Sequence, residues 1–158
     1  MSQNTVDTRH LARLITLQKL FERQFRKNDI SQSSANEFTN TELADLIAEQ
    51  SKSENQYDKK LADQLLKGVI QYQEKIDYII KELAPEWPIE QINKTDLQIL
   101  RIAVFEGFIS QITPEKVAIN EAIDLGKEFA GQASGNFING VLGNLLQNRS
   151  KFEQALKA

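Results

Sequence analysis

The residues from Gly135 to Gly140 bring an aromatic ring, two amides and two glycines into one short stretch. Asn136 and Asn139 flank Phe137, and the glycines leave the surrounding surface thin. Proteins use a ring beside amide side chains to stack an unpaired nucleobase and hydrogen-bond to its edge. Alternatively, Phe137 is an ordinary core anchor and the asparagines are helix caps, because apolar residues at helical spacing usually pack. The stretch is therefore either a candidate single-stranded RNA site or part of the core.

A second candidate group is the concentration of positive charge in residues 9–27. This segment has a net charge of +5, whereas the whole chain has a formal charge of -3. On a wheel of 100° per residue the basic side chains fall opposite the apolar ones. The basic residues are Arg9, Arg13, Lys19, Arg23, Arg26 and Lys27. Such a strip binds phosphates in a salt-sensitive manner, unless it is simply the solvated face of an amphipathic helix.

The sequence has none of the motifs that usually indicate catalysis. It contains no P-loop, no dinucleotide-binding glycine pattern and no HExxH motif. With no cysteine, thiol catalysis, disulfides and thiolate zinc sites are excluded. His10, the only histidine, has no second ligand beside it, and the pair Glu106 and Glu121 lacks a companion nucleophile. We therefore expect no enzymatic activity, no metal and no cofactor.

The apolar spacing is helical almost throughout, and three prolines and seven glycines interrupt it. The sequence predicts an all-α fold, a compact bundle of about seven helices in two helical halves. The halves are expected at about 8–84 and 89–148, with a tail at 149–158, and together they suit one domain of 158 residues. Without an 18-residue apolar run or a signal peptide, we expect a soluble cytoplasmic protein with no membrane contact.

Caps, prolines and glycines predict where the helices begin and end. The expected helices occupy about residues 8–27, 42–50, 57–83, 94–110, 114–130 and 134–147. A polar loop at 28–38 precedes the second helix, which the capping box of Thr39 and Glu42 opens. Thr113 is expected to cap the helix that starts at Pro114. A tight connection from Gly131 to Asn136 follows that helix, and Ser134 is expected to cap the last one.

Two features predict how the second half is built. Pro85 and Pro88 stop helical propagation, so residues 84–93 form a candidate hinge, with Trp87 plugging the junction. The helix at 94–110 is apolar on nearly every side and must be surrounded by others. Its charged residues, Arg101 and Glu106, are then partly buried and need partners, as Glu121 does in the following helix.

The motifs VAINEAIDLGKEF and SGNFINGVL, with LQILRIAVFEG upstream, resemble the NusB family of transcription antitermination factors. The resemblance extends to LARLITLQKLF near the start and LADQLLKGVIQYQEKID in the middle, so it covers most of the chain. It implies an all-helical, NusB-like domain over residues 1–158 that binds single-stranded boxA RNA. The implied partner is NusE, which is also ribosomal protein S10, within a transcription complex.

The resemblance also implies site residues, position by position. Its RNA contacts fall on Arg9, His10, Arg13 and Gln18 in the first helix. In the last helix they fall on Asn136, Phe137 and Asn139. NusE is expected to dock on the C-terminal half, around Asp96. The acidic balance outside the first helix suits a basic partner, because complementary potential speeds association.

Two departures from the family pattern lower the expected RNA affinity. Family members often have a run of arginines where this chain reads Arg9, His10, Leu11, Ala12 and Arg13, and a lysine is frequent at Asn136. The competing hypothesis is a helical protein-protein adaptor in which the basic strip has no RNA role. The RNA sequence recognised and the oligomeric state, monomer or homodimer, stay open.

Overall fold

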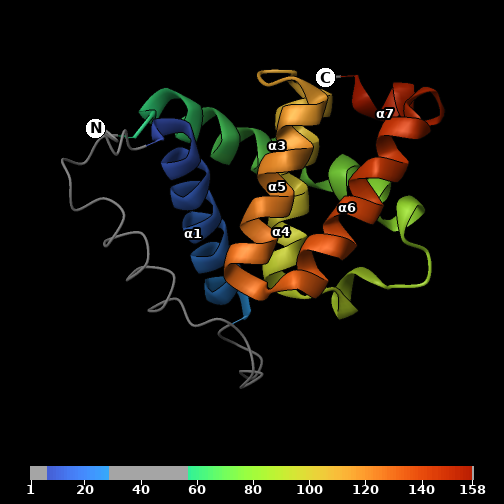
Figure 1. The fold of residues 1–158 in the computed structure, drawn as a ribbon, viewed down its shortest axis with the longest axis horizontal. Coiled ribbons are helices and arrows are strands. Elements are labelled where there is room, and N and C mark those ends of the chain that lie inside the picture. The colour runs from blue at the N-terminus through green and yellow to red at the C-terminus, as the bar shows by residue number, and fades with distance from the viewer. Residues whose placement is uncertain (1–6, 29–56, 158) are drawn as a thin grey trace, which may run out of the picture. The chain divides into compact units, whose positions relative to one another are not determined.

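The computed structural model describes residues 7–28 and 57–157. Every regular element in these ranges is a helix, which confirms the predicted all-α class (Figure 1). The chain forms two compact units, Met1–Leu66 and Lys67–Ala158. The predicted helix at 42–50, with its capping box and most of the loop before it, lies outside the described residues. The hinge predicted at 84–93 lies inside the second unit.

Helix α1 (Thr8–Asn28) dominates the described part of the first unit. Asp7 caps it, because its Oδ1 accepts hydrogen bonds from the backbone N–H groups of Arg9 and His10, each at 3.1 Å. The start of α3 (Lys59–Leu83) lies against it, since the N–H of Asp58 donates to the carbonyl of Thr8 at 3.1 Å. The buried apolar side chains of α1 are Leu11, Ala12, Leu14, Leu17, Leu20 and Phe21. This is the amphipathic packing that its spacing predicted.

In the second unit, α3 ends where the two prolines were expected to stop it. A short 3-10 helix, η1 (Ile89–Gln91), follows Pro88. The predicted role of Trp87 is wrong: the side chain is 51% exposed and plugs no junction. The reason is local, because the chain between Leu83 and Ile89 is non-helical and has no apolar face to direct the ring inward.

Helix α4 (Lys94–Ala103) is the centre of the second unit, as predicted. Asn93 caps it by accepting hydrogen bonds from the N–H groups of Thr95 and Asp96 at 2.8 and 3.3 Å. Its residues from Thr95 to Ala103 are all buried, and α5 and α6 pack on it (Figure 1). The helix continues as a π-helical segment, η2 (Val104–Ile109), which is also fully buried. The sequence predicted this continuation but not its π-helical hydrogen bonding.

Helices α5 (Glu115–Ala130) and α6 (Gln132–Gln147) follow each other almost without a break. Gly131 alone connects the two helices. Its φ of 95° lies in a region that glycine adopts at little cost, which allows so short a connection. The prediction of a longer connection, from Gly131 to Asn136, was therefore wrong. The predictions that Thr113 and Ser134 cap the starts of these two helices were also wrong. The Thr113 hydroxyl donates to Oε1 of Glu106 at 3.1 Å, and Ser134, already inside α6, donates to Oδ2 of Asp96 at 3.1 Å.

The C-terminal tail is folded as far as the structure describes it. A 3-10 helix, η3 (Arg149–Phe152), continues into the single-turn helix α7 (Glu153–Leu156). Phe152 and Leu156 are buried, and the Nζ of Lys75 donates to the carbonyl of Lys157 at 3.1 Å. Apolar burial and this hydrogen bond therefore hold the tail in the second unit. None of the helices in the described ranges has the length and hydropathy needed to cross a membrane.

Candidate nucleic-acid interface

Helix α6 presents the three site residues predicted from its sequence on its surface. Asn136 and Asn139 are exposed, and Phe137 is half-buried. The Oδ1 of Asn136 accepts a hydrogen bond from Nε2 of Gln132 at 3.0 Å. The side chain of Gln132, one helical turn earlier, therefore orients the Asn136 amide. The ring of Phe137 is thus neither sealed in the core nor free of contacts. This position suits a platform on which a flat group packs.

The two glycines beside these residues differ from each other. Gly140 is exposed and nothing lies within 4 Å of where its Cβ would be, so the surface there is thin as predicted. Gly135 is buried, and an added Cβ would lie 2.6 Å from Cγ of Lys127. The prediction of thin surface at Gly135 was therefore wrong, because the stem of Lys127 covers it.

Phe137 lines a pocket of about 200 Å³ in the second unit. The rest of the lining comes from η1 and its flanks and from the start of α4. The lining residues are Trp87, Gln91, Ile92, Asn93, Asp96 and Phe137. Sequence reasoning missed Trp87 as a site residue and placed Asp96 only in a partner surface. The pocket joins two aromatic rings, two amides and a carboxylate, a set that stacks and hydrogen-bonds a planar polar group.

Asp96 is the buried carboxylate among the lining residues. It is only 6% exposed, and its Oδ2 accepts the hydrogen bond from Ser134. Its Oδ1 is buried and has no hydrogen-bond partner among the described residues. Leaving a buried acceptor unsatisfied costs about 1 to 3 kcal/mol. Burial raises the pKa of Asp96 above its ordinary value, and the Ser134 hydrogen bond opposes this rise only in part.

The raised pKa of Asp96 gives a testable pH dependence of stability. The folded state binds the Asp96 proton more tightly than the unfolded state does, so its contribution is full below the unfolded pKa of 3.8 and lost as pH rises through the folded value. The wild type should therefore gain stability relative to Asp96→Asn as pH falls from about 7 to about 4. Urea unfolding of both proteins across this range measures the difference. A difference that is flat, or that shrinks on acidification, would contradict the assignment.

The site residues predicted on α1 differ in exposure. Arg9 is exposed, and His10 and Gln18 are half-buried. Lys19, Arg23 and Arg26 are exposed as well, so most of the predicted basic strip lies on the surface. These residues form a cationic face within the first unit.

Arg13 departs from this pattern, since it is only 3% exposed. The prediction that it belongs to the surface strip was wrong. On the helical wheel Arg13 lies between Leu17 and Leu20, and both of these are buried. The sequence contained this signal, because including Leu20 widens the apolar side of the helix until it reaches Arg13.

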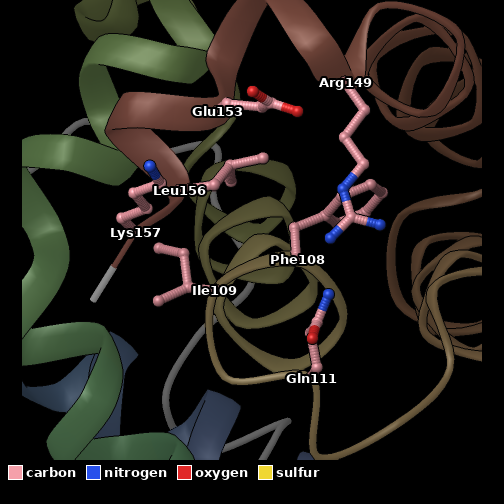
Figure 2. Close-up of a pocket in the computed structure, with 7 residues that line it drawn as sticks. All are labelled: Phe108, Ile109, Gln111, Arg149, Glu153, Leu156 and Lys157. Carbon is pink, nitrogen blue, oxygen red and sulfur yellow. The ribbon is translucent and has the colours of Figure 1, made fainter.

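A second pocket, of about 610 Å³, lies between η2 and the C-terminal tail (Figure 2). Phe108, Ile109 and Leu156 form its apolar part, and the side chain of Arg149 reaches across it toward Phe108 (Figure 2). Arg149 also forms an ion pair with Glu115. None of the predicted site residues lines this pocket. Within the described ranges, no three His, Asp or Glu side chains come together as metal ligands.

Comparison with known proteins places this geometry in a family. A profile of the NusB family matches residues 10–147. The transcription antitermination protein NusB of Clostridium acetobutylicum is 34% identical over 140 residues, which span 89% of this chain and 96% of that protein.

Solved structures share the fold. A crystal structure of NusB from T. maritima has a TM-score of 0.64 and 25% identity, covering 93% of this chain and 99% of the other. A chain in a structure described as a plectonemic RNA supercoil has a TM-score of 0.66 over 89% of this chain and 95% of its own, but at 22% identity this likeness concerns the fold alone. Since the family profile covers most of the sequence and the relative matches over nearly its whole length, the chain belongs to the NusB family.

Proposed function

We propose that this chain is a non-enzymatic, RNA-binding transcription antitermination factor. It binds single-stranded, boxA-like RNA together with NusE, the ribosomal protein S10. The observation that carries the proposal is the half-buried ring of Phe137 between two exposed amides on α6. The ring supplies a stacking face, and Asn136 and Asn139 supply donors and acceptors for base edges.

The cationic face of α1 supports the same function. Arg9, Lys19, Arg23 and Arg26 are exposed and would neutralise phosphates, while His10 and Gln18 would add polar contacts to the RNA. Arg13 is buried, so we assign it the role of supporting the helix beneath these contacts. Relatives carry the name transcription antitermination protein NusB, which supports the same function.

The proposed partner surface lies on the second unit around the start of α4. Asp96 itself is buried, so NusE would touch the exposed residues near it. Outside residues 9–27 the chain has a net charge of -8, which favours association with a basic ribosomal protein. This charge balance would favour the protein partner, whereas the basic first helix and the Phe137 site on α6 would bind RNA.

Titration of a fluorescent boxA-like RNA at low and moderate salt, with and without NusE, tests the proposal. We expect Phe137→Ala to weaken RNA binding about tenfold to a hundredfold, because one base stacked on an aromatic ring contributes about 1 to 3 kcal/mol. Arg9→Ala should lower the slope of log affinity against log salt by about one. Gln147→Ala, an exposed change at the far end of α6, should leave both quantities unchanged.

Thermal melting of the same variants separates stacking from packing. A loss of about 3 to 5 kcal/mol of stability in Phe137→Ala would identify the ring as a core anchor. If no RNA binds with or without NusE, or if removing Arg9 has no effect, the proposal fails. Retained NusE binding in that case would favour the protein-protein adaptor.

A further inference from the structure

We propose that the pocket between η2 and the C-terminal tail binds a small organic carboxylate with a flat apolar body. Its volume of about 610 Å³ lies within the range of about 300 to 1,000 Å³ that is typical of small-molecule sites. None of the residues that we assign to RNA binding lines this pocket, and neither does Asp96. The inference therefore goes beyond the proposed function and concerns a separate site in the second unit.

Irregular backbone forms one wall of the pocket. Phe108 and Ile109 belong to the π-helical segment η2, and π-helical turns are frequent at functional sites. Gln111, which follows η2, has φ of 54° and is the only non-glycine residue with positive φ in the described ranges. A residue with a side chain adopts this conformation at a cost in free energy, and such strain clusters at ligand sites. The exposed side chain of Gln111 lines the pocket.

Arg149 supplies the group that would recognise the carboxylate. Its side chain is 42% exposed, and its Nη1 donates to Oε1 of Glu115, whose side chain is 17% exposed. This ion pair leaves the edge formed by Nε and Nη2 without a partner among the described residues. Arg101 uses the same edge to bind both oxygens of Asp77. The carboxylate of a ligand can make the same two parallel hydrogen bonds to Arg149.

The charged and polar lining favours a ligand with one negative charge. Arg149 and Lys157 are cations and Glu153 is an acid, so the lining has a net charge of +1. The amide of Gln111 points toward the guanidinium end of Arg149 and can donate to the same anion (Figure 2). A monoanion therefore suits the pocket better than a dianion, and the planar guanidinium matches a planar carboxylate.

A strip of aliphatic surface lies beside these donors. Ile109 and Leu156 are 9% and 7% exposed, and they lie between Lys157 and Arg149 in the view of Figure 2. The tail that carries Leu156 is held in place, because Nζ of Lys75 donates to the carbonyl of Lys157 at 3.1 Å. The flat body of an aromatic carboxylate would cover this strip while its carboxylate binds Arg149.

The test compares 2-naphthoate with 2-naphthamide, a neutral probe of nearly the same shape. Titration of the full chain, without RNA, is followed by NMR of the side-chain N–H groups, including those of Arg149 and Gln111. We expect naphthoate to bind about tenfold more tightly than naphthamide, because charge-assisted hydrogen bonds are about twice as strong as neutral ones. Arg149→Met should abolish this difference and leave the affinity for naphthamide unchanged.

Three further variants separate ligand binding from the structural role of the ion pair. Glu115→Gln breaks the pair but keeps Arg149, so it should bind naphthoate at least as tightly as the wild type does. Gln111→Gly should raise the melting temperature by relieving the backbone, yet weaken naphthoate binding about threefold by removing a donor. Arg23→Met removes an exposed cation of α1, outside the pocket, and should change neither affinity.

The opposite results would overturn the carboxylate site. Equal affinities for the two probes, or a difference that survives Arg149→Met, would show that Arg149 recognises no anion here. Equal losses of naphthoate binding in Glu115→Gln and Arg149→Met would assign the effect to the ion pair. Displacement of naphthoate by boxA-like RNA would also overturn the site, because the pocket would then hold an RNA phosphate. Failure of the chain to bind RNA at all would overturn the proposed function and leave this site standing.

Discussion

Asp77→Ala is expected to lower the free energy of unfolding by about 3 kcal/mol. Asp77 on α3 accepts two hydrogen bonds from one edge of the Arg101 guanidinium, with Nε to Oδ1 at 2.8 Å and Nη2 to Oδ2 at 2.9 Å. The side chain of Arg101 is only 9% exposed, whereas that of Asp77 is 23% exposed. Removing the acid therefore leaves a buried cation without its partner. Urea unfolding followed by far-UV circular dichroism measures the loss.

Two control variants show whether the expected loss of stability comes from breaking the ion pair or from changing the helix surface. Glu74→Ala removes an exposed acid from the same helix and should change stability by no more than about 0.5 kcal/mol. The double variant Asp77→Leu, Arg101→Met removes both charges and should recover most of the stability lost by Asp77→Ala. Equal losses in Asp77→Ala and Glu74→Ala would contradict a structural role for this ion pair.

The ends of α3 and α5 could be predicted because local chemistry sets them. Pro85 and Pro88 end α3, and Gly131 ends α5, through backbone effects that do not depend on distant contacts. The burial of α4 followed from its apolar residues on every side. These predictions needed only the order of residues along each helix.

Predictions failed where a side chain had a choice between local and distant partners. Thr113 and Ser134 were expected to cap their own helices, but their hydroxyls donate to Glu106 and Asp96 on other elements. The prediction that Arg101 is buried and paired was confirmed, but its partner, Asp77, lies 24 residues upstream and could not be named from the sequence. Short-range patterns favour the local option, and only the packed fold decides between them.

The candidate site was predictable only where its residues are close together in the sequence. Phe137, Asn136 and Asn139 lie within one helical turn, so their spacing alone brought them together. Trp87 joins Phe137 only through the fold, from a segment about 50 residues earlier whose prolines suggested a junction and not a pocket. Asp96 was noticed for its position near a partner surface, but its unmet acceptor appears only in the structure.

The π-helical segment η2 was also beyond the reach of sequence patterns. Its hydrogen bonding is visible where the N–H of Ser110 donates to the carbonyl of Phe105 at 2.8 Å, five residues back. Apolar spacing does not distinguish this geometry from an α-helix. Gly107 within it allows close approach of α5, since an added Cβ would lie 2.8 Å from Cβ of Ala118. The close contact between η2 and α5 thus depends on the absence of a side chain at Gly107.

Gly68→Ala is expected to destabilise the protein by about 3 kcal/mol, at the upper end for overpacking of a core. Gly68 is buried in α3, and an added Cβ would lie 2.0 Å from Cζ of Phe105 and 2.2 Å from its Cε2. The Phe105 ring cannot swing aside freely, because it is 7% exposed and stacks on Tyr72 with 6.0 Å between ring centroids. The missing side chain at Gly68 therefore makes the contact between α3 and η2 possible.

Gly143→Ala in α6 provides the matched control, since nothing lies within 4 Å of its added Cβ. There alanine should raise stability by about 0.4 to 1 kcal/mol, because it restricts the unfolded chain and favours the helix. Chemical denaturation of both variants should thus give changes of opposite sign for the same substitution in two helices. Adding Phe105→Leu to Gly68→Ala should recover part of the loss, since the ring that collides with the new methyl group is gone. A Gly68→Ala protein as stable as Gly143→Ala would show that α3 and η2 do not need this close approach.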